Sequence, residues 1–233
     1  MQTKTIGLLG GIGWASTAEY YRLINEMVSA REGDAHSARI VLHSMDQFDF
    51  TSRAASADPQ EIIGYIAAQA ALLKAGGADC FLLCANGAHR FAPAVLPLVD
   101  LPFISIVDAT VRQVQASGIG KVSLLGVRQT MAGRFYHDKL ESAGIEVLTP
   151  APKDQETIHA IIYGELVQNR ITDASRRVFV DIIAQLAAQG AQGCILGCTE
   201  IPLLVKPEHV AIPVFDTTAI HCQAAVAFAF GEA

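Results

Sequence analysis

The stretch IGLLGGIGWASTAEYYRLI, residues 6–24, decides the fold, because its pattern returns in the second half of the chain. The later stretch VSLLGVRQTMAGRFYHDKL, residues 122–140, aligns with it through Leu-Leu-Gly and through Tyr20 and Tyr136. Each stretch begins with a short apolar run and continues, after glycine, into a helical pattern. This order is typical of a buried parallel strand that leads into a helix. The repeat therefore predicts two similar α/β halves.

Two further matches occur in the same order in both halves. GADCFLLCANG (77–87) aligns with GAQGCILGCTE (190–200), and LPFISI (101–106) aligns with IPVFDT (212–217). Because apolar strands alternate with helices throughout, we expect parallel sheets covered on both faces. The expected fold is α/β, with two flavodoxin-like three-layer domains, pseudo-symmetric, and a site in the crevice between them. Strands are predicted over 4–9, 38–44, 80–84, 103–106, 121–125, 146–148, 193–196 and 213–215.

The first domain is expected over residues 1–117 plus 217–233, and the second over residues 118–216.

The composition of the chain restricts the classes of function that it can have. Hydrophobic residues make up 51% of the chain, charged residues only 17%, and the net charge is −6. This balance argues against a sequence-independent nucleic-acid binder, which needs clustered Lys and Arg. No apolar run approaches the ~20 residues that span a bilayer, and the start lacks a signal-peptide pattern, so we expect a cytoplasmic protein.

The cysteines predict reduced thiols, because their number is odd and no export signal is visible. Two C-x3-C pairs lie in or just after apolar runs without the histidines and turn glycines of a zinc site, so no metal is expected. The five cysteines are Cys80, Cys84, Cys194, Cys198 and Cys222.

GGIGWAST resembles a dinucleotide-binding loop, but Ser16 occupies the third glycine position, which leaves nucleotide binding as a minor alternative.

Small polar residues follow the predicted strands, where ligands of parallel α/β sheets bind. Such residues satisfy helix N-terminal amides, and several together can also hold a carboxylate or phosphate. The repeat places Cys198 opposite Ala85 and Cys84 opposite Gly197. Since a shift of one residue turns a side chain to the other face of a strand, Cys84 is expected in its own core.

These motifs resemble the aspartate/glutamate racemase family over nearly the whole chain. The resemblance rests on residues 6–25, on LLGVRQTM (124–131), on ILGCTEIPLL (195–204), on IPVFDTTAIH (212–221) and on CANGAH (84–89). It implies racemisation of an amino acid without metal, pyridoxal phosphate or another cofactor. Two cysteines, one per domain, would face opposite sides of the substrate Cα. The resemblance also implies a homodimer.

The first catalytic segment departs from the family pattern Cys-Asn-Thr, because the chain has Ala85, Asn86 and Gly87 there. Our hypothesis is an aspartate or glutamate racemase that acts from one face. The alternatives are a decarboxylase of substituted malonates that uses one cysteine, and a non-catalytic binder of small carboxylates or amino acids. The resemblance assigns catalysis to Cys198 and substrate binding to Ala85, Asn86, Gly87, Thr130 and Thr199, with Ser16, Thr17 and Thr218 as further candidates.

Overall fold

The computed structural model describes residues 3–232, which form two compact units. Unit 1 comprises the chain up to Ile106 together with the segment from His221, and unit 2 runs from Val107 to Ile220. The sequence-based halves divide after residue 117, whereas the units divide at Ile106. As a result, nearly all of helix α5 (Ile106–Ala116) lies in unit 2, and helix α11 (Thr217–Ala229) begins in unit 2 and ends in unit 1.

Unit 1 is built on a parallel sheet with the order β2-β1-β3. The predicted strand over 103–106 is reduced to a single bridge between Phe81 and Phe103, because α5 already begins at Ile106. The strands of this sheet are β1 (Ile6–Gly10), β2 (Ile40–Ser44) and β3 (Cys80–Leu83).

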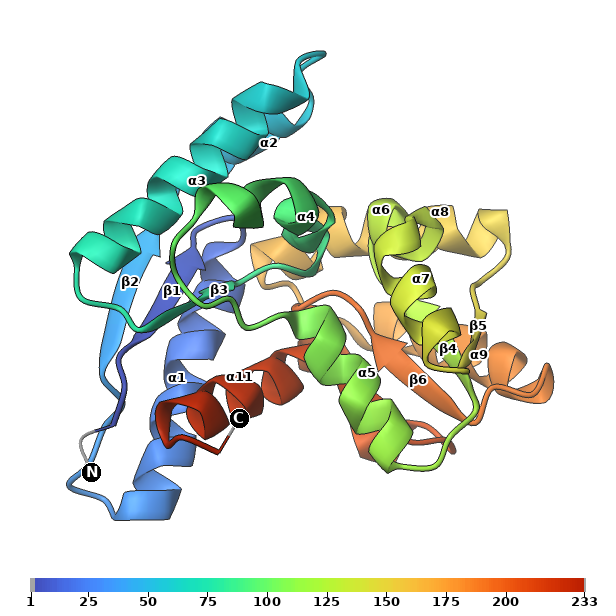
Figure 1. Cartoon of the computed structure of the whole chain (residues 1–233). Coiled ribbons are helices and arrows are strands. Elements are labelled where there is room, and N and C mark those ends of the chain that lie inside the picture. Colours follow the sequence, from blue (N-terminus) through green and yellow to red (C-terminus); the bar gives the residue numbers. More distant parts are fainter. Residues whose placement is uncertain (1–2, 233) are drawn as a thin grey trace. The chain divides into compact units, whose positions relative to one another are not determined.

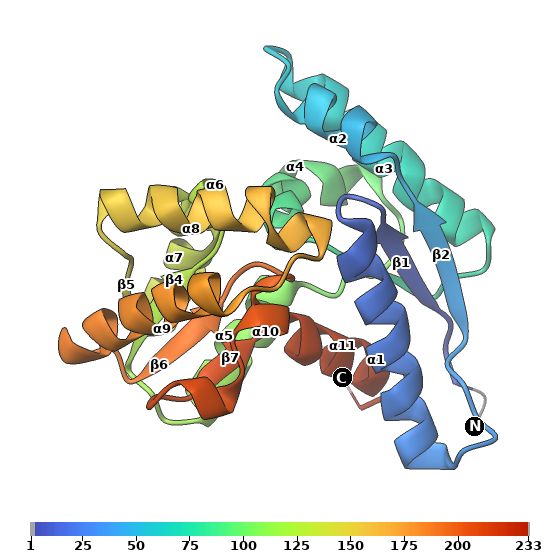
Figure 2. The ribbon, with the colours of Figure 1, turned by 180° about the vertical axis from the view of Figure 1, so that it is seen from behind.

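Helices cover both faces of this sheet (Figures 1 and 2). Helix α3 (Pro59–Ala75) begins at Asp58, whose carboxylate accepts the Gln60 N–H, and Pro59 fits the first helical position. Its buried stripe packs with Leu9, Phe81 and Leu83 on one face. On the other face, α1 (Trp14–Glu32) and the unit 1 part of α11 pack with Leu8, Leu82 and Cys84. The remaining helices of unit 1 are α2 (Gln47–Ala54), η1 (Asn86–Phe91), α4 (Ala92–Val95) and η2 (Leu96–Leu98).

Unit 2 repeats this topology with a parallel sheet of order β5-β4-β6-β7. Strand β4 corresponds to β1, β5 to β2 and β6 to β3, in agreement with the internal repeat. Strand β7 takes the place that the Phe103 bridge has in unit 1. The strands are β4 (Lys121–Leu125), β5 (Glu146–Leu148), β6 (Gly193–Leu196) and β7 (Val214–Asp216).

The second sheet is also covered on both faces, as the opposite views of Figures 1 and 2 show. Helices α8 (Pro152–Gly164) and α9 (Asp173–Ala188) pack with Leu125 and Leu196 on one face. Helices α5 and α7 (Arg134–Ser142) lie on the other face, where Lys139 and Asp108 form an ion pair of 2.8 Å. The parallel α/β class predicted from the sequence is confirmed. The remaining helices of unit 2 are α6 (Arg128–Ala132), η3 (Leu166–Gln168), α10 (Ile201–Leu204) and η4 (Pro207–His209).

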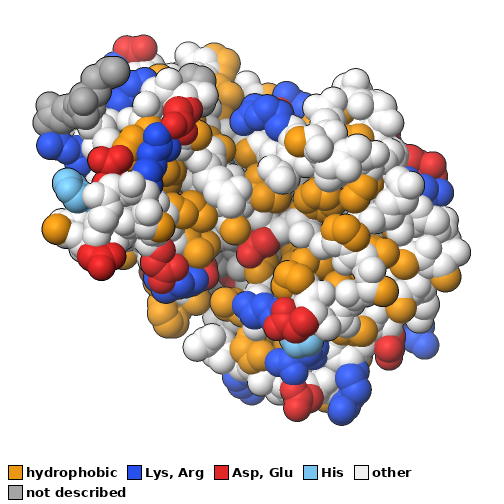
Figure 3. Space-filling view, turned by 90° about the horizontal axis from the view of Figure 1, so that it is seen from below, with side chains coloured by type: hydrophobic (Ala, Val, Ile, Leu, Met, Phe, Trp, Pro, Cys, Tyr) orange, Lys and Arg blue, Asp and Glu red, His pale blue; other side chains and the backbone are white. Residues whose placement is uncertain are grey.

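The surface carries charges of both signs. On the face shown in Figure 3, Lys and Arg side chains lie among Asp and Glu side chains. Within helices, side chains of opposite charge form ion pairs: Arg22 contacts Glu19 and Glu26, and Arg134 contacts Asp138. Such exposed pairs contribute little to stability. Within residues 3–232, no helix is both long and apolar enough to cross a membrane.

The turn after β1 requires a glycine at position 11. Gly11 has a φ of +86°, and a Cβ on it would lie 1.9 Å from the Met45 carbonyl oxygen. We expect Gly11→Ala to lower the free energy of unfolding by about 2–3 kcal/mol, because backbone must shift and the conformation is strained for an L side chain. Urea denaturation followed by far-UV circular dichroism measures this loss.

Gly64, inside α3, provides the matched control. A Cβ there meets no heavy atom within 4 Å, and its φ is not positive. Gly64→Ala should leave stability unchanged or raise it by about 0.5–1 kcal/mol, because alanine favours the helix. Equal urea midpoints for the two variants would contradict the steric role of Gly11.

Candidate active site

Three neighbouring strands of unit 2 end in polar residues at the same edge of the sheet. Strands β4, β6 and β7 are adjacent and parallel, so their carboxyl ends lie side by side. Thr130 follows β4 on α6, and Thr218 follows β7 on α11. Cys198, Thr199 and Glu200 follow β6. This edge is where parallel α/β sheets bind ligands.

Cys198 is a buried thiol with a specific hydrogen-bond partner. Its side chain is 7% exposed, and its Sγ donates to Glu200 Oε2 at 3.0 Å. Thr199 Oγ1 donates to the same oxygen at 3.0 Å. Burial, followed by the negative charge of Glu200, raises the pKa of Cys198 well above its usual value, whereas hydrogen bonds from the main-chain N–H groups of Glu200 and Thr199 act in the opposite direction. Cys198 therefore rests as a protonated thiol that donates its hydrogen bond to the Glu200 carboxylate.

Thr130 and Thr218 are buried, at 0% and 1% exposure. Within residues 3–232, the hydroxyl oxygens of these two residues are the buried side-chain oxygen and nitrogen atoms that find no hydrogen-bond partner. A buried polar group left in this way costs about 1–3 kcal/mol. Unmet hydroxyls at a strand-end edge are therefore suited to contact a bound ligand.

The position of Thr130 follows from two glycines. A Cβ on Gly126 would lie 2.9 Å from Thr130 Cβ, and a Cβ on Gly197 would lie 2.9 Å from Thr130 Cγ2. Thr130 therefore packs its methyl group between the ends of β4 and β6, close to the chain that leads into Cys198. Thr217, next to Thr218, has a different task, because its hydroxyl donates to the Leu196 carbonyl at 2.8 Å and ties α11 to β6.

In unit 1, the corresponding strand end carries Ala85. The Leu9 carbonyl accepts the Cys84 N–H at 3.0 Å, and the Leu125 carbonyl accepts the Gly197 N–H at 2.6 Å. Since β1 and β4 correspond, Cys84 takes the place of Gly197, and the next residue, Ala85, takes the place of Cys198. The register of the two sheets thus agrees with the sequence repeat.

Cys84 is a core residue, as expected from the repeat. It is 1% exposed and packs with Tyr20, Leu82 and Cys222, on the sheet face opposite to that of Leu83. Burial raises the pKa of Cys84 well above its usual value. A neutral thiol in an apolar core is chemically inert.

The residues after Ala85 form η1, and His89 holds this segment in place. Asn86 is the first residue of η1, and its side chain is buried, with 4% exposed. Next to it, Gly87 borders open space, because a Cβ added to it would meet no heavy atom within 4 Å. His89 Nε2 accepts the Ile106 N–H at 3.2 Å, which assigns the ring proton to Nδ1, and Nδ1 donates to the Ala85 carbonyl at 2.9 Å. His89 therefore ties the backbone at Ala85 to the start of α5.

His221 is buried beside His89, with the ring centroids 5.5 Å apart. Its Nε2 donates to the Ile104 carbonyl at 2.7 Å, so its Nδ1 accepts from the Tyr20 hydroxyl at 2.8 Å. Burial, followed by the neighbouring His89, lowers the pKa of His221 well below its usual value. Both ring nitrogens of His221 are occupied, which gives this histidine a structural role in unit 1.

Ser16 and Thr17 lie in the first turn of α1 and are buried. Thr17 Oγ1 accepts the Gly11 N–H at 2.9 Å and donates to the Gly13 carbonyl at 3.0 Å. Thr17 therefore holds the loop after β1, a task that sequence reasoning missed. Glu200 was not among the predicted site residues, although its position two residues after Cys198 was a signal that it could contact this thiol.

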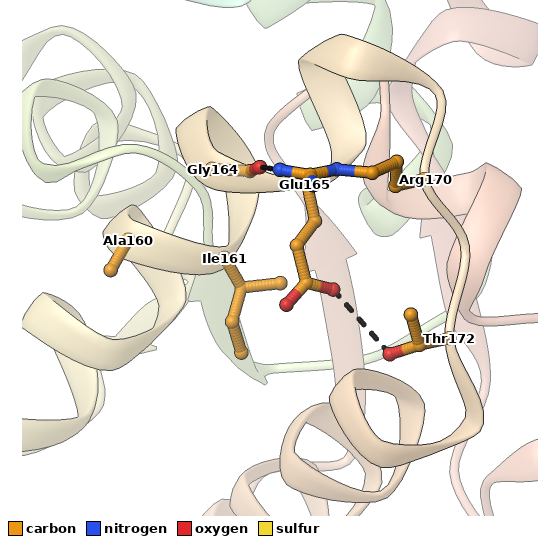
Figure 4. A pocket seen from close by; sticks show the side chains of 6 residues that line it. All are labelled: Ala160, Ile161, Gly164, Glu165, Arg170 and Thr172. Carbon is orange, nitrogen blue, oxygen red and sulfur yellow. Dashed lines mark hydrogen bonds between the residues drawn. The ribbon is translucent and has the colours of Figure 1, made fainter.

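An open pocket of about 400 Å³ lies elsewhere on unit 2 (Figure 4). In this pocket Thr172 Oγ1 donates to Glu165 Oε2 at 3.4 Å, and the Arg170 guanidinium donates to the Gly164 carbonyl. None of the residues predicted for the site lines this pocket. Its lining residues are Ala160, Ile161, Gly164, Glu165, Arg170 and Thr172.

All five cysteines are buried, and none of them forms a disulfide. Over residues 3–232, no group of three or more His, Cys, Asp or Glu side chains is arranged to hold a metal ion. The reactive groups found at the edge of the second sheet are therefore the thiol of Cys198, the carboxylate of Glu200 and the hydroxyls around them.

Two solved structures have the same fold as this chain. The crystal structure of a candidate Asp/Glu racemase from Yersinia pestis superposes with a TM-score of 0.90 at 43% identity, over 97% of this chain and 99% of that one. An aspartate racemase homologue from Pyrococcus horikoshii superposes with a TM-score of 0.85 at 29% identity, over 97% and 99% of the two chains.

A curated relative matches over almost its whole length. The broad-specificity amino-acid racemase RacX of Bacillus subtilis is 22% identical over 226 residues, which cover 95% of this chain and 96% of that protein. The family model described as Asp/Glu/Hydantoin racemase matches residues 9–225. With its two parallel α/β units and a thiol at a strand-end edge, this chain belongs to the Asp/Glu/Hydantoin racemase family.

Proposed function

We propose that this protein is a cofactor-independent amino-acid racemase in which Cys198 exchanges the α-proton from one face of Cα. The observation that carries the proposal is the buried Cys198 thiol, hydrogen-bonded to Glu200, at the same sheet edge as two unmet hydroxyls. Relatives that are named as amino-acid racemases support the reaction class. Aspartate and glutamate are the substrates that the family resemblance favours.

The chemistry demands stabilisation of a carbanion, because the α-proton of an amino acid is very weakly acidic. Preorganised donors in a dry site supply that stabilisation more effectively than water does. In this proposal the hydroxyls of Thr130 and Thr218 donate to substrate oxygens, which gives them the partners they lack in the free protein. Asn86 and Thr199 are further proposed contacts, carried over from the family resemblance.

Ala85 makes the proposed reaction one-sided. The two-thiol mechanism needs a second thiol at the position in unit 1 that corresponds to Cys198, and alanine has no proton to exchange. Proton exchange at Cα should therefore be faster than inversion, because water or a weaker acid has to protonate the opposite face. Location in the cytoplasm and assembly as a homodimer stay predictions.

The wild-type protein in D2O tests the proposal directly. We expect loss of the α-proton signal in proton NMR from one enantiomer of aspartate or glutamate, with slower appearance of the other enantiomer by chiral chromatography. The Cys84→Ala variant serves as a control that lacks a core thiol and should exchange at the wild-type rate. Absence of exchange from both enantiomers of both amino acids would refute the proposal.

The second candidate is a decarboxylase of substituted malonates, and the presence of Ala85 at the strand end of unit 1 favours it. One thiol suffices to protonate the enolate that remains after loss of carbon dioxide. Release of carbon dioxide from alkylmalonates or arylmalonates, without α-proton exchange from amino acids, would support this reaction. Binding of an amino acid without either reaction would indicate a non-catalytic binder.

A further inference from the structure

Two buried histidines hold the segment by which the chain leaves unit 1, whose last residue there is Ile106. The Ile106 N–H donates to His89 Nε2 at 3.2 Å, and His221 Nε2 donates to the Ile104 carbonyl at 2.7 Å. His89 is 4% exposed and His221 0%. Since both rings are buried, water competes little for these bonds.

Each of the two rings supplies one donor and one acceptor. His89 donates from Nδ1 to the Ala85 carbonyl and accepts at Nε2. His221 has the opposite arrangement, because it donates from Nε2 and accepts the Tyr20 hydroxyl at Nδ1. Only a neutral imidazole has one nitrogen of each kind. With both nitrogens of each ring in use, the two histidines are suited to hold backbone in place rather than to exchange a proton with a substrate.

His89 acts on the peptide bond between Ala85 and Asn86. The Ala85 carbonyl, which accepts the Nδ1–H at 2.9 Å, belongs to that peptide bond. Because a peptide bond is planar, a fixed carbonyl also fixes the direction in which the chain continues into Asn86. Asn86 and His89 lie three residues apart in η1, which is one turn of a 3₁₀ helix. His89 therefore controls the backbone of the two residues that end the strand and begin η1.

We propose that His89 is a positioning residue of the substrate site: its Nδ1–H orients the peptide between Ala85 and Asn86, and its Nε2 anchors this peptide to Ile106. This inference rests on the proposed function, in which Asn86 contacts the substrate. Ala85 holds the position where the two-thiol mechanism needs its second thiol. His89 thus supports substrate binding, whereas removal of the α-proton stays with Cys198.

The two hydrogen bonds of His89 can be removed one at a time. The amide nitrogen of asparagine lies as far along the side chain as Nδ1. His89→Asn can therefore still donate to the Ala85 carbonyl, but it offers no acceptor to the Ile106 N–H. The amide oxygen of glutamine reaches the position of Nε2. His89→Gln can therefore still accept from Ile106, but it loses the donor to Ala85.

Steady-state kinetics of α-proton exchange in D2O distinguish the two variants. We expect His89→Gln to raise KM for aspartate or glutamate at least about fivefold with kcat changed less than about twofold, because a lost hydrogen bond weakens binding and leaves Cys198 untouched. His89→Asn should keep KM within about threefold of wild type. Equal KM values in the two variants would overturn the proposal.

His137→Gln is the matched control. His137 lies in α7, and its Nδ1 donates to the Gly133 carbonyl at 2.9 Å, which repeats the spacing of four residues and the length of the bond from His89 to Ala85. Helix α7 carries no residue predicted for the site. His137→Gln should keep KM within about threefold of wild type. A rise in KM as large as that of His89→Gln would overturn the specific role of His89.

Hydrogen–deuterium exchange, followed by mass spectrometry, needs no substrate. In His89→Asn, the main-chain amide of Ile106 should exchange at least about threefold faster than in the wild-type protein, because it has lost its acceptor. In His89→Gln, the faster exchange should instead lie in η1, residues 86–91. Faster exchange of the same segment in both variants would contradict the separate tasks of the two ring nitrogens.

The failure of this inference and the failure of the proposed function give different results. If the wild-type protein does not exchange the α-proton but binds aspartate or glutamate in isothermal titration calorimetry, the racemase proposal fails. The dissociation constants of the His89 variants then replace KM, with the same expected ratios. Absence of both exchange and binding would refute both proposals. If His89→Gln does not fold, His89→Asn decides, because a KM more than about threefold above wild type would overturn the inference.

Discussion

Replacement of Cys198 by serine is expected to reduce α-proton exchange about 10³-fold, the largest loss that a single substitution should cause. Serine preserves the size of the side chain and can donate to Glu200 Oε2, so the hydrogen bond of 3.0 Å has a structural substitute. A hydroxyl gives up its proton far less readily than a thiol, and the carboxylate cannot make it an adequate base. Proton NMR in D2O, with saturating aspartate or glutamate, measures the loss.

Cys194 and Cys84 are the controls for the Cys198→Ser experiment. Both are buried thiols in strands or directly after them, and burial raises the pKa of Cys194 to about 12. Cys194→Ala and Cys84→Ala should lower stability by about 1 kcal/mol but keep exchange within about twofold of wild type. Exchange that persists in Cys198→Ser and disappears in Cys84→Ala would contradict the proposal, because it would identify Cys84 as the reactive thiol.

Ala85→Cys is expected to convert exchange into racemisation. The substitution restores a thiol at the position in unit 1 that the strand register matches to Cys198. We expect the ratio of inversion to exchange to rise at least about tenfold, because an acid on the second face then competes with water. The Ala85 side chain is only partly buried, so it is not fully enclosed by the core. Chiral chromatography and deuterium incorporation, measured on the same samples, give the ratio.

Ala85→Ser is the matched control, because serine has nearly the size of cysteine but lacks its acidity. It should keep the inversion-to-exchange ratio of the wild-type protein. Equal ratios in the cysteine and serine variants would show that position 85 is not where the second acid/base belongs. A bound substrate that protects Cys198, but not the new thiol, from alkylation would lead to the same conclusion.

The strands, and the sheet face to which each of their side chains points, could be predicted from the sequence because both depend on the local pattern of apolar residues. Apolar runs such as 121–125 and 193–196 became strands with the predicted bounds. The one-residue offset between Cys84 and Cys198 became a difference of sheet face, since alternate residues of a strand point to opposite sides. The predicted strand over 103–106 was reduced to a single bridge at Phe103, and the strand predicted over 38–44 begins only at Ile40.

The candidate site was harder to predict from the sequence, because it depends on which side chains form hydrogen bonds with one another. Thr17 and Thr218 are both hydroxyl residues after a strand, yet Thr17 is used by its own loop, whereas Thr218 has an unmet hydroxyl oxygen. The sequence offered no way to tell these two roles apart. The same holds for His89, which proved to link Ala85 to Ile106.

By itself, the sequence determined the succession of strands and helices, the internal repeat and the absence of a thiol opposite Cys198, because these features depend on residue order and periodicity. The tertiary structure decided which polar groups meet. It brought the Glu200 carboxylate to 3.0 Å from the Cys198 sulfur, and within residues 3–232 it left the hydroxyls of Thr130 and Thr218 without a hydrogen-bond partner. The physical reason is that hydrogen bonds require distances and directions that only the packed strand ends supply, whereas burial requires only a pattern.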